Sequence, residues 1–254
     1  MLEKIGQSME LGHTDYGPHW FRRYAAFWGP VEQFVYLDAR QITLGNIEVF
    51  FDALNVGFDI VYADAALNQV YEAGELRNEF LRAGGARGFI SNAWASRRGV
   101  FDIEQLVTLS REVAINRRQL NARNTDQAFI NYCCDAQRLK MARLADVMGD
   151  LCQSGWARNT GRIYRDGSGL ARLWDHGGLD HRKKVLLVHW AGLPFELSGP
   201  KGNLLMKYTN LGKRQVAIQL LYEIRRKPIK MLRSRRTANN LFNRVKQWIL
   251  HGKA

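Results

Sequence analysis

The sequence predicts an α/β fold, because short apolar runs of strand length alternate with segments of helical pattern. The clearest strand is predicted at 34–38, where aromatic and β-branched residues end on a carboxylate. Further strands are predicted at 58–63, 89–96 and 185–188. Ligands of open α/β sheets bind outside the carboxyl ends of the strands. The charged end of the first strand is therefore the first candidate for a functional site.

A helix is predicted before this strand, over residues 20–29, and Gly29 ends it. At 3.6 residues per turn, the pattern places Trp20, Tyr24 and Phe27 on one face. A face with three aromatic side chains predicts packing against the core.

Three helices are predicted after the first strand. Residues 41–51 predict a short turn that leads into the first of them. A longer helix is predicted at about 102–118, with Asp102 as its N-cap. Thr125-Asp126 is the predicted cap of a helix from Gln127 to Ala136.

The positive charge of the chain lies at its C-terminal end. The net charge is +13, and residues 201–254 contain 14 Lys and Arg but a single acidic residue, Glu223. The 200 residues before them carry equal numbers of acidic and basic side chains. The sequence therefore predicts a neutral domain over 1–200 and a basic helical tail over 201–254.

Composition also argues against several classes of protein. No apolar run approaches the ~18 residues that a membrane span needs, and the N-terminus lacks a signal-peptide pattern. The three cysteines are an odd number, and Cys133 and Cys134 are adjacent, which indicates neither a disulfide framework nor a Cys-x-x-Cys metal site. We therefore expect a cytoplasmic protein.

The residues around the first strand carry a more specific pattern. Tyr36-Leu37-Asp38 is followed by Thr43-Leu44-Gly45-Asn46-Ile47-Glu48 and by Phe50-Phe51. This pattern resembles the strand, metal loop and following helix of GT-A-fold nucleotide-sugar glycosyltransferases, in particular the retaining type that includes glycogenin and galactosyltransferases. The resemblance implies a mixed sheet flanked by helices and a nucleotide-diphosphate sugar as donor. It also implies that the helix at 20–29 lines the sugar site.

The resemblance departs from the family at the metal loop. In those enzymes the strand ends in Asp-x-Asp, whose carboxylates hold Mn²⁺ or Mg²⁺ against the donor diphosphate. Here Asp38 matches the first carboxylate, but Arg40 stands in place of the second. A guanidinium does not ligate a metal ion and repels it at close range. Two interpretations follow: Arg40 replaces the metal and binds the phosphate oxygens directly, or the site has lost its function.

Two later residues extend the diphosphate side of the implied site. His189 is similar to the late histidine of metal-dependent members, which implies that Asp38 and His189 are the metal ligands; a histidine at a strand end is also commonly structural. Lys201 lies where such enzymes often place a lysine on the diphosphate. The expected diphosphate-binding residues are therefore Asp38, Arg40 and Lys201.

Three residues are implied on the sugar side. Asn92 lies in a segment similar to the family's Asn-x-Gly, and Asp126-Gln127 with Asn131 is similar to its Asp-Gln-x-x-x-Asn helix start. The expected catalytic residues are therefore Asn92, Asp126 and Gln127, although Asp126 taken alone is equally explained as a helix N-cap. Only 33 residues precede the first strand, so the family's N-terminal nucleotide-binding unit is expected to be absent, or Met1 is not the true start.

The expected function is transfer of a sugar from a nucleotide-diphosphate sugar to a saccharide, lipid-linked or other cell-envelope acceptor. Such transfer needs positive charge at the departing diphosphate and a carboxylate or amide near the anomeric carbon. The alternative is a catalytically inactive remnant that binds a membrane or a partner through its basic tail.

Three interpretations of the tail are open. Residues 213–226 and 241–249 place aliphatic residues and Trp248 at helical spacing beside lysines and arginines. This pattern favours contact with the anionic inner face of a membrane, ahead of docking on the domain. Nucleic acid ranks last, because no base-stacking platform accompanies the basic residues.

Deletion of residues 213–254 tests the membrane interpretation. We expect the full chain to sediment with anionic liposomes and the shortened chain to stay in the supernatant, because the basic amphipathic pattern is then missing. Neutral liposomes are the control. Unchanged sedimentation of the shortened chain would contradict the interpretation.

Overall fold

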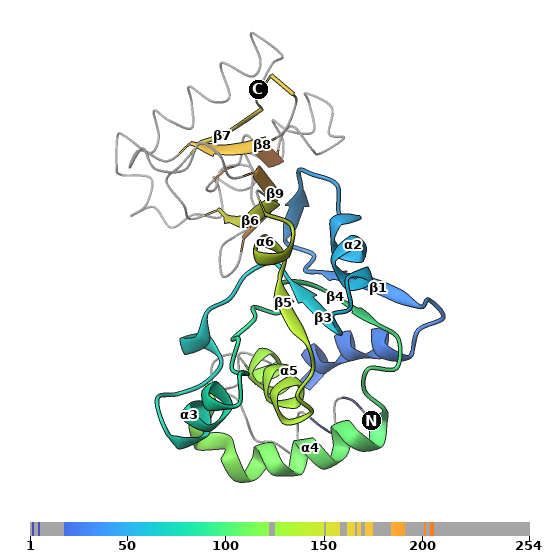
Figure 1. The fold of residues 1–254 in the computed structure, drawn as a ribbon, viewed down its shortest axis with the longest axis vertical. Coiled ribbons are helices and arrows are strands. Elements are labelled where there is room, and N and C mark those ends of the chain that lie inside the picture. Colours follow the sequence, from blue (N-terminus) through green and yellow to red (C-terminus); the bar gives the residue numbers. More distant parts are fainter. Residues whose placement is uncertain are drawn as a thin grey trace, which may run out of the picture. The chain divides into compact units, whose positions relative to one another are not determined.

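A computed structural model gives the fold of the chain (Figure 1). It describes residues 18–121, 125–149, 151–157, 162–165, 167–168, 171–174, 184–190 and 204–205, together with Leu2, Ile5 and Lys201. Apart from Lys201, Leu204 and Leu205, the tail predicted over 201–254 lies outside these residues. Among the described residues, no helix has the length and apolar character needed to cross a membrane.

The described elements alternate between strands and helices, which confirms the α/β class. In chain order they are η1 (Pro18–Trp28), β1 (Gln33–Leu37), β2 (Gln41–Thr43), α2 (Val49–Asn55), β3 (Ile60–Tyr62), η2 (Leu67–Gln69), α3 (Glu75–Arg82), β4 (Ala93–Arg97), α4 (Ile103–Asn116), η3 (Arg117–Gln119), α5 (Thr125–Ala136), β5 (Met141–Arg143), α6 (Leu144–Val147), β6 (Leu151–Trp156), β7 (Arg162–Arg165), β8 (Ala171–Trp174) and β9 (Lys184–His189).

By its contacts the chain divides into two compact units. The first consists of Met1–Ala39, Thr43–Ser154 and Gly161–Leu187, and the second of Arg40–Ile42, Gly155–Thr160 and Val188–Ala254. A second sheet has the strand order β2-β9-β8-β7, and β6 also pairs with β9. The prediction of a turn and helix over 41–51 was wrong for residues 41–43, which form β2, and right for the helix that follows.

The first unit contains a mixed four-stranded sheet in the order β1-β4-β3-β5. Strand β4 is antiparallel to both β1 and β3, and β3 is parallel to β5. Strands β1, β3 and β5 therefore run in one direction, and their carboxyl ends lie at the same edge as the start of β4. This edge carries Asp38, which follows β1, and Asn92, which precedes β4; the Asp38 N–H donates to the Asn92 carbonyl at 2.9 Å.

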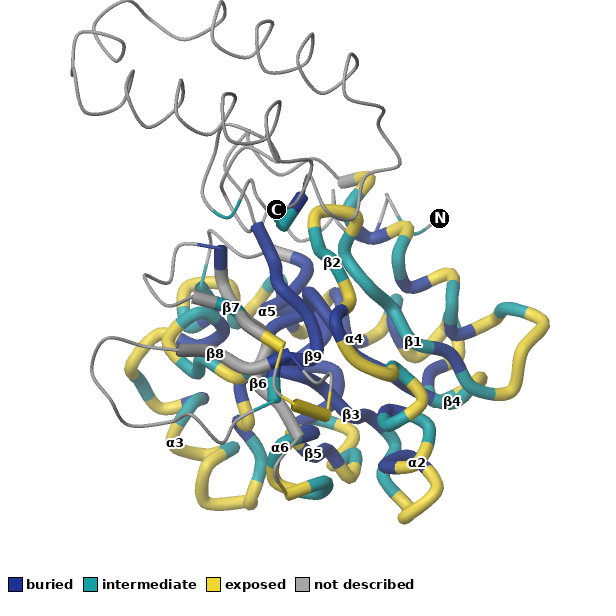
Figure 2. The backbone as a smooth tube through the Cα atoms, turned by 90° about the horizontal axis from the view of Figure 1, so that it is seen from above, coloured by how far each residue is buried: buried dark blue, intermediate teal, exposed yellow. Residues whose placement is uncertain are grey.

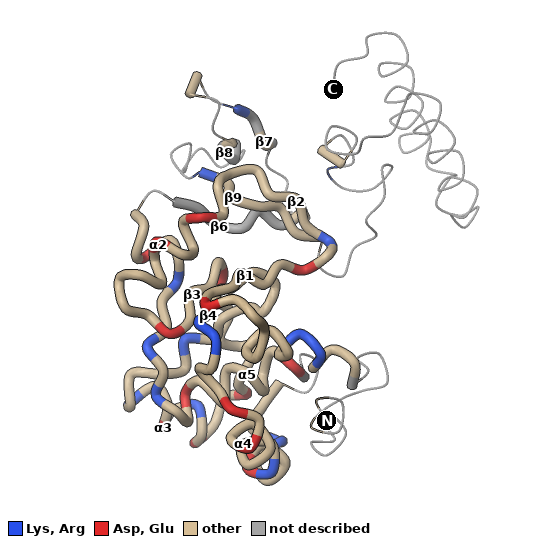
Figure 3. The backbone as a smooth tube through the Cα atoms, turned by 90° about the vertical axis from the view of Figure 1, so that its right-hand side faces the viewer, with Lys and Arg blue, Asp and Glu red and all other residues tan. Residues whose placement is uncertain are grey.

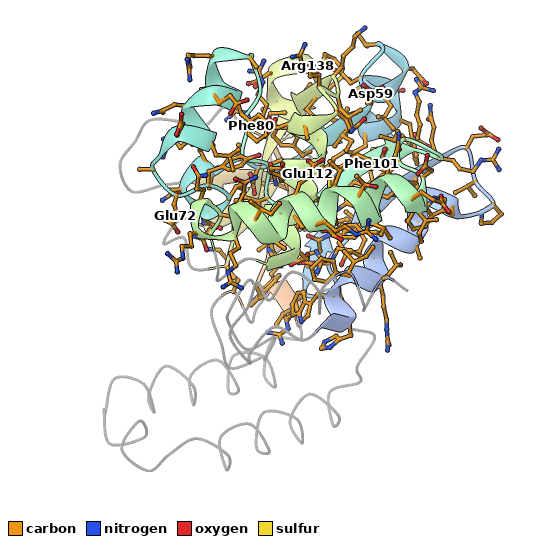
Figure 4. The ribbon with its side chains drawn as sticks, turned by 90° about the horizontal axis from the view of Figure 1, so that it is seen from below. Asp59, Glu72, Phe80, Phe101, Glu112 and Arg138 are labelled. Carbon is orange, nitrogen blue, oxygen red and sulfur yellow. The ribbon has the colours of Figure 1, made fainter. Side chains whose placement is uncertain are left out.

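Helices cover both faces of this sheet, because successive strand residues point to opposite sides. Ile60, Tyr62 and Trp94 pack into a large core with η1, α4 and α5. Val61 and Ala95 face the other way, into a second core with α2 and α6. Figure 4 shows the side chains around α4, with Glu112 labelled. The Tyr132 hydroxyl of α5 donates to Glu112 at 3.1 Å.

The first predicted helix is a 3₁₀ helix, η1, and this changes which residues share a face. A 3₁₀ helix has three residues per turn, so side chains three apart align. Burial follows that period: Phe21, Tyr24 and Phe27 are 2%, 0% and 0% exposed. Figure 2 colours the backbone by burial, with buried stretches such as that of strand β9 in dark blue. Trp20 and Arg23 lie in the neighbouring, half-buried row. The prediction that Trp20 shares a face with Tyr24 and Phe27 was therefore wrong.

Helix α4 begins where the sequence predicts, at the Asp102 cap. The Asp102 carboxylate accepts a hydrogen bond from the Gln105 N–H at 2.6 Å, and the Gln105 side chain accepts one from the Asp102 N–H at 3.0 Å. This reciprocal pair is a capping box, which satisfies two N–H groups that the helix start leaves without partners.

Polar side chains of α5 hold the chain that leads into β4. Gln127, Asn131 and Asp135 are spaced by four residues and so lie on one face of the helix. Gln127 Oε1 accepts from the Ser91 N–H at 3.0 Å, Asn131 accepts from and donates to Phe89 at 2.9 Å each, and Asp135 Oδ1 accepts from the Ala86 N–H at 2.9 Å.

These contacts explain why the strand predicted at 89–96 begins only at Ala93. The main-chain groups of Phe89 and the N–H of Ser91 bond to α5 instead of to a strand. Gly88 allows the close approach that this docking needs. It has a φ of +64°, and a Cβ at this position would lie 2.5 Å from the Leu67 Cα.

The buried Asp135 carboxyl predicts a pH-dependent stability. Burial raises its pKa to about 6, against the lowering effect of hydrogen bonds from the Tyr71 hydroxyl and the Ala86 N–H. Between pH ~4 and ~6 the folded state keeps a proton that the unfolded state releases, so this group's contribution falls as pH rises, by about 3 kcal/mol in all.

We expect Asp135→Asn to remove this contribution. Urea unfolding of the wild type and the variant at pH 4 and pH 7 measures it. The stability difference between the two proteins should change between these pH values by about 2–3 kcal/mol, in favour of the variant at pH 7. Exposed Asp52→Asn is the control, and parallel pH profiles for Asp135→Asn and the wild type would contradict the expectation.

Candidate functional site

A buried arginine lies at the centre of the charged network at the sheet edge. Arg23 Nη1 is 3.2 Å from Asp126 Oδ2 and 3.8 Å from Asp38 Oδ1. The same nitrogen donates to the Ser91 carbonyl at 3.1 Å and contacts the Ser91 hydroxyl at 3.2 Å. Since these partners come from three separate parts of the chain, Arg23 joins η1 to the end of β1, the start of β4 and the first turn of α5.

Two aromatic rings complete the surroundings of the guanidinium. The Arg23 Cζ lies 4.8 Å from the centre of the Tyr36 ring and 5.2 Å from that of Trp20. Contacts of this kind between a cation and a ring are stabilising, the more so when water is excluded. Tyr36 also reaches the carboxylate, because its hydroxyl donates to Asp38 Oδ1 at 2.9 Å. Ring and hydroxyl together orient the pair formed by Arg23 and Asp38.

Burial and charge act in opposite directions on the groups of this network. Burial lowers the pKa of Arg23, but Asp126 and its other neighbours outweigh this and raise it overall, so the guanidinium stays charged. Burial raises the pKa of Asp126, and Asp38 adds to that effect while Arg23 opposes it. Figure 3 shows acidic and basic residues interspersed over this unit. With all three groups ionised, the network carries one net negative charge.

Access distinguishes the two carboxylates. The Asp126 side chain is 7% exposed and that of Asp38 is 21% exposed. Asp126 is the second residue of α5, a position where the helix dipole favours a negative charge. A ligand therefore reaches Asp38 more readily than Asp126. The more buried Asp126 forms the closer ion pair with Arg23.

Four of the residues selected from the sequence belong to this one network. Asp38 and Asn92 are joined through the main chain, and Asp126 forms an ion pair with Arg23. Gln127 binds the Ser91 N–H and, at 3.3 Å, the Gln69 carbonyl, so its amide positions the segment that carries Asn92. Asn92, Asp126 and Gln127 are all buried.

The other three selected residues belong to the second unit. The Arg40 carbonyl accepts a hydrogen bond from the Trp190 N–H at 2.9 Å, and the His189 carbonyl accepts one from the Ala157 N–H at 2.9 Å. His189 is buried and Arg40 is exposed. Lys201 has a φ of +58°, and burial lowers its pKa.

The space between Asp38 and Asp126 does not fit a divalent metal ion. The two carboxylates converge there, but both are already paired with the same guanidinium. A divalent ion would have to share this position with a positive charge. Over the described parts of the chain, no group of three or more His, Cys, Asp or Glu side chains is placed to hold a metal.

Sequence reasoning missed Arg23 and the role of Tyr36. The helical period was the obstacle: at 3.6 residues per turn Arg23 falls beside the predicted apolar face, whereas at three per turn it aligns with Trp20. The signal that was available is a pair of arginines, Arg22 and Arg23, among the five aromatic residues between Trp20 and Trp28, counting both ends.

The chain matches no protein-family model, and comparisons with curated proteins and with solved structures find no match.

A double-mutant cycle measures the pairing of Arg23 with Asp126. Arg23→Met leaves a buried carboxylate without its cation and should cost about 3–5 kcal/mol of unfolding free energy. Asp126→Asn should cost less, because Arg23 keeps Asp38 and Ser91. The double variant should lose less than the sum of the two, by at least about 1 kcal/mol, because the two groups interact directly.

The exposed pair of Arg98 and Glu32 is the matched control. Its atoms are closer, at 2.6 Å, but its side chains are 45% and 81% exposed. The same cycle there should give a coupling below about 1 kcal/mol, because solvent screens exposed charges. Urea unfolding measures both cycles, and additive losses at Arg23 and Asp126 would contradict a direct pair.

Proposed function

We propose that this chain transfers a sugar from a nucleotide-diphosphate sugar to a saccharide or cell-envelope acceptor. One observation carries the proposal. Asp38, Asn92, Asp126 and Gln127, which the glycosyltransferase resemblance selects from distant parts of the sequence, belong to one network at the carboxyl edge of a mixed sheet. Open α/β sheets bind ligands at this edge.

The proposal gives each residue of the first unit a distinct task. Asp38, the more exposed carboxylate, binds a sugar hydroxyl or takes the proton of the acceptor hydroxyl. Asp126 fixes Arg23, and Arg23 fixes Asp38. Gln127 holds the main chain beside Asn92, whose amide faces the donor sugar in this scheme. Reaction geometry thus depends on a network that is in place before the substrate arrives.

The departing diphosphate requires positive charge, which the first unit does not supply in excess. Arg23 is balanced by two carboxylates, so we assign the phosphate oxygens to Arg40 and Lys201 of the second unit. The guanidinium of Arg40 is suited to phosphate, because its donors form a planar fork. Mn²⁺ or Mg²⁺ on Asp38 and His189 remains the alternative source of positive charge in this proposal.

The proposal also covers the fold family of the domain and the role of the tail. We infer a GT-A-like domain and a basic tail over 201–254 that contacts an anionic membrane surface. A lipid-linked or envelope acceptor would suit that location. Nucleic acid is the less favoured partner, because no base-stacking platform accompanies the basic residues of the tail.

One observation favours a second candidate, a non-catalytic remnant that binds a partner or a membrane through its tail. Both candidate carboxylates are paired with the same internal cation, Arg23, and such buried ion pairs also occur for purely structural reasons. Donor binding distinguishes the two candidates, because a remnant has no need to retain it.

The test is transfer from a panel of UDP-, GDP-, ADP- and dTDP-sugars to mixed saccharide acceptors, with and without Mn²⁺. Release of the nucleoside diphosphate is measured for the wild type, Asp38→Asn and Asp126→Asn. We expect each variant to lose transfer by about 10²-fold or more, as for loss of a proton-transferring or orienting group. Asp52→Asn, at an exposed position of helix α2, should keep full activity.

Circular dichroism must show that the variants stay folded. Full transfer by Asp38→Asn would contradict the assignment of that residue. If no donor in the panel shifts the thermal unfolding of the wild type, the remnant becomes the better explanation.

A further inference from the structure

The two carboxylates of the site converge on a single cation that belongs to the chain. Asp38 and Asp126 are 88 positions apart in the sequence, yet one nitrogen of Arg23 lies within 4 Å of both. Carboxylates that converge in this way from separate elements are also the usual beginning of a divalent metal site, because hard cations prefer oxygen ligands. The difference here is that a guanidinium already occupies the position between them.

This guanidinium is fixed on several sides. Its Nε donates to the Trp20 carbonyl at 3.3 Å, Nη1 donates to the Ser91 carbonyl, and the rings of Trp20 and Tyr36 lie against it. The Arg23 side chain is only 7% exposed. Moving it away would leave the buried Asp126 carboxylate without its counter-charge, which is costly. The cation is therefore part of the folded structure and, unlike a bound metal ion, cannot dissociate from the site.

We propose that Arg23 is the resident cation of this site and takes the place of a divalent metal ion between Asp38 and Asp126. Because the guanidinium fills the space between the carboxylates, Mn²⁺ does not bind there in the wild type. Arg23 acts through the two carboxylates, so it is a positioning residue. This inference does not depend on glycosyl transfer, because it concerns only the charges that the chain brings together.

A specific consequence follows from counting charges. The network has two negative charges and one positive charge, so loss of Arg23 leaves two carboxylates that a divalent ion would neutralise in full. Replacement of Arg23 by a shorter, uncharged polar residue should therefore unmask a metal site. Glutamine is the suitable replacement, because its amide nitrogen corresponds to the arginine Nε, which donates to the Trp20 carbonyl at 3.3 Å, and its side chain leaves the position of the guanidinium nitrogen between the carboxylates empty.

The experiment is a titration of the full chain with MnCl₂, followed by the EPR signal of free Mn²⁺, which decreases as the ion binds. We expect Arg23→Gln to bind Mn²⁺ at least about tenfold more tightly than the wild type, a difference of about 1.4 kcal/mol. Arg23→Gln combined with Asp38→Asn should lose that gain. Arg98→Gln makes the same chemical change at an exposed pair and should gain nothing.

Each outcome decides the proposal. A folded Arg23→Gln variant that binds Mn²⁺ no better than the wild type overturns it. If Arg23→Gln does not fold, Mn²⁺ binding by the wild type is compared with Mn²⁺ binding by Asp38→Asn, and this comparison decides the proposal. Stoichiometric Mn²⁺ binding by the wild type that Asp38→Asn removes overturns the proposal, because a metal then shares the site with Arg23. Absence of any Asp38-dependent binding by the wild type supports it. Both readouts are independent of sugar transfer, so failure here and failure of the proposed activity are distinguishable.

Discussion

The buried guanidinium of Arg23 is the interaction on which the edge of the first sheet depends. It is the common partner of a carboxylate after β1, a main-chain carbonyl before β4 and a carboxylate at the start of α5. Without it, Asp126 would have to be buried as an unpaired charge or protonated, and either change alters the packing of α5 against η1. The arrangement of the candidate site therefore follows from one charge that the fold must enclose.

Helix α5 supplies the second constraint, through a row of polar side chains along one face. Asp126 at its start bonds to Arg23, and Gln127, Asn131 and Asp135 bond to the main chain of residues 86–91. The segment that enters β4 is thus held along its whole length by side chains of a single helix. Its position and that of Asn92 are coupled to the ion pair, because both depend on where α5 lies.

Much of this fold can be predicted from the sequence, since the signals are local. Apolar runs mark β1, β3 and β9, and Asp102 with Gln105 marks the start of α4. The charged network is different, because its members come from separate elements and the direction of β4 decides which ends meet. Arg23 was missed for a further reason: the period of η1 is three residues, and aromatic positions spaced by three and four fit either helix type.

The 3₁₀ geometry of η1 links the stability of the core to the electrostatics of the site. Runs of 3₁₀ helix this long are uncommon, because their hydrogen bonds are less well aligned than those of an α-helix. The eleven residues of η1 must then be held by packing, and the buried row of Phe21, Tyr24 and Phe27 provides it. That row fixes the rotation of the helix, and the rotation directs Arg23 toward the two carboxylates. In a metal site, the positive charge between the carboxylates depends on whether the ion is bound. Here the positive charge belongs to Arg23, and the packing of the aromatic row brings it to the carboxylates when the chain folds.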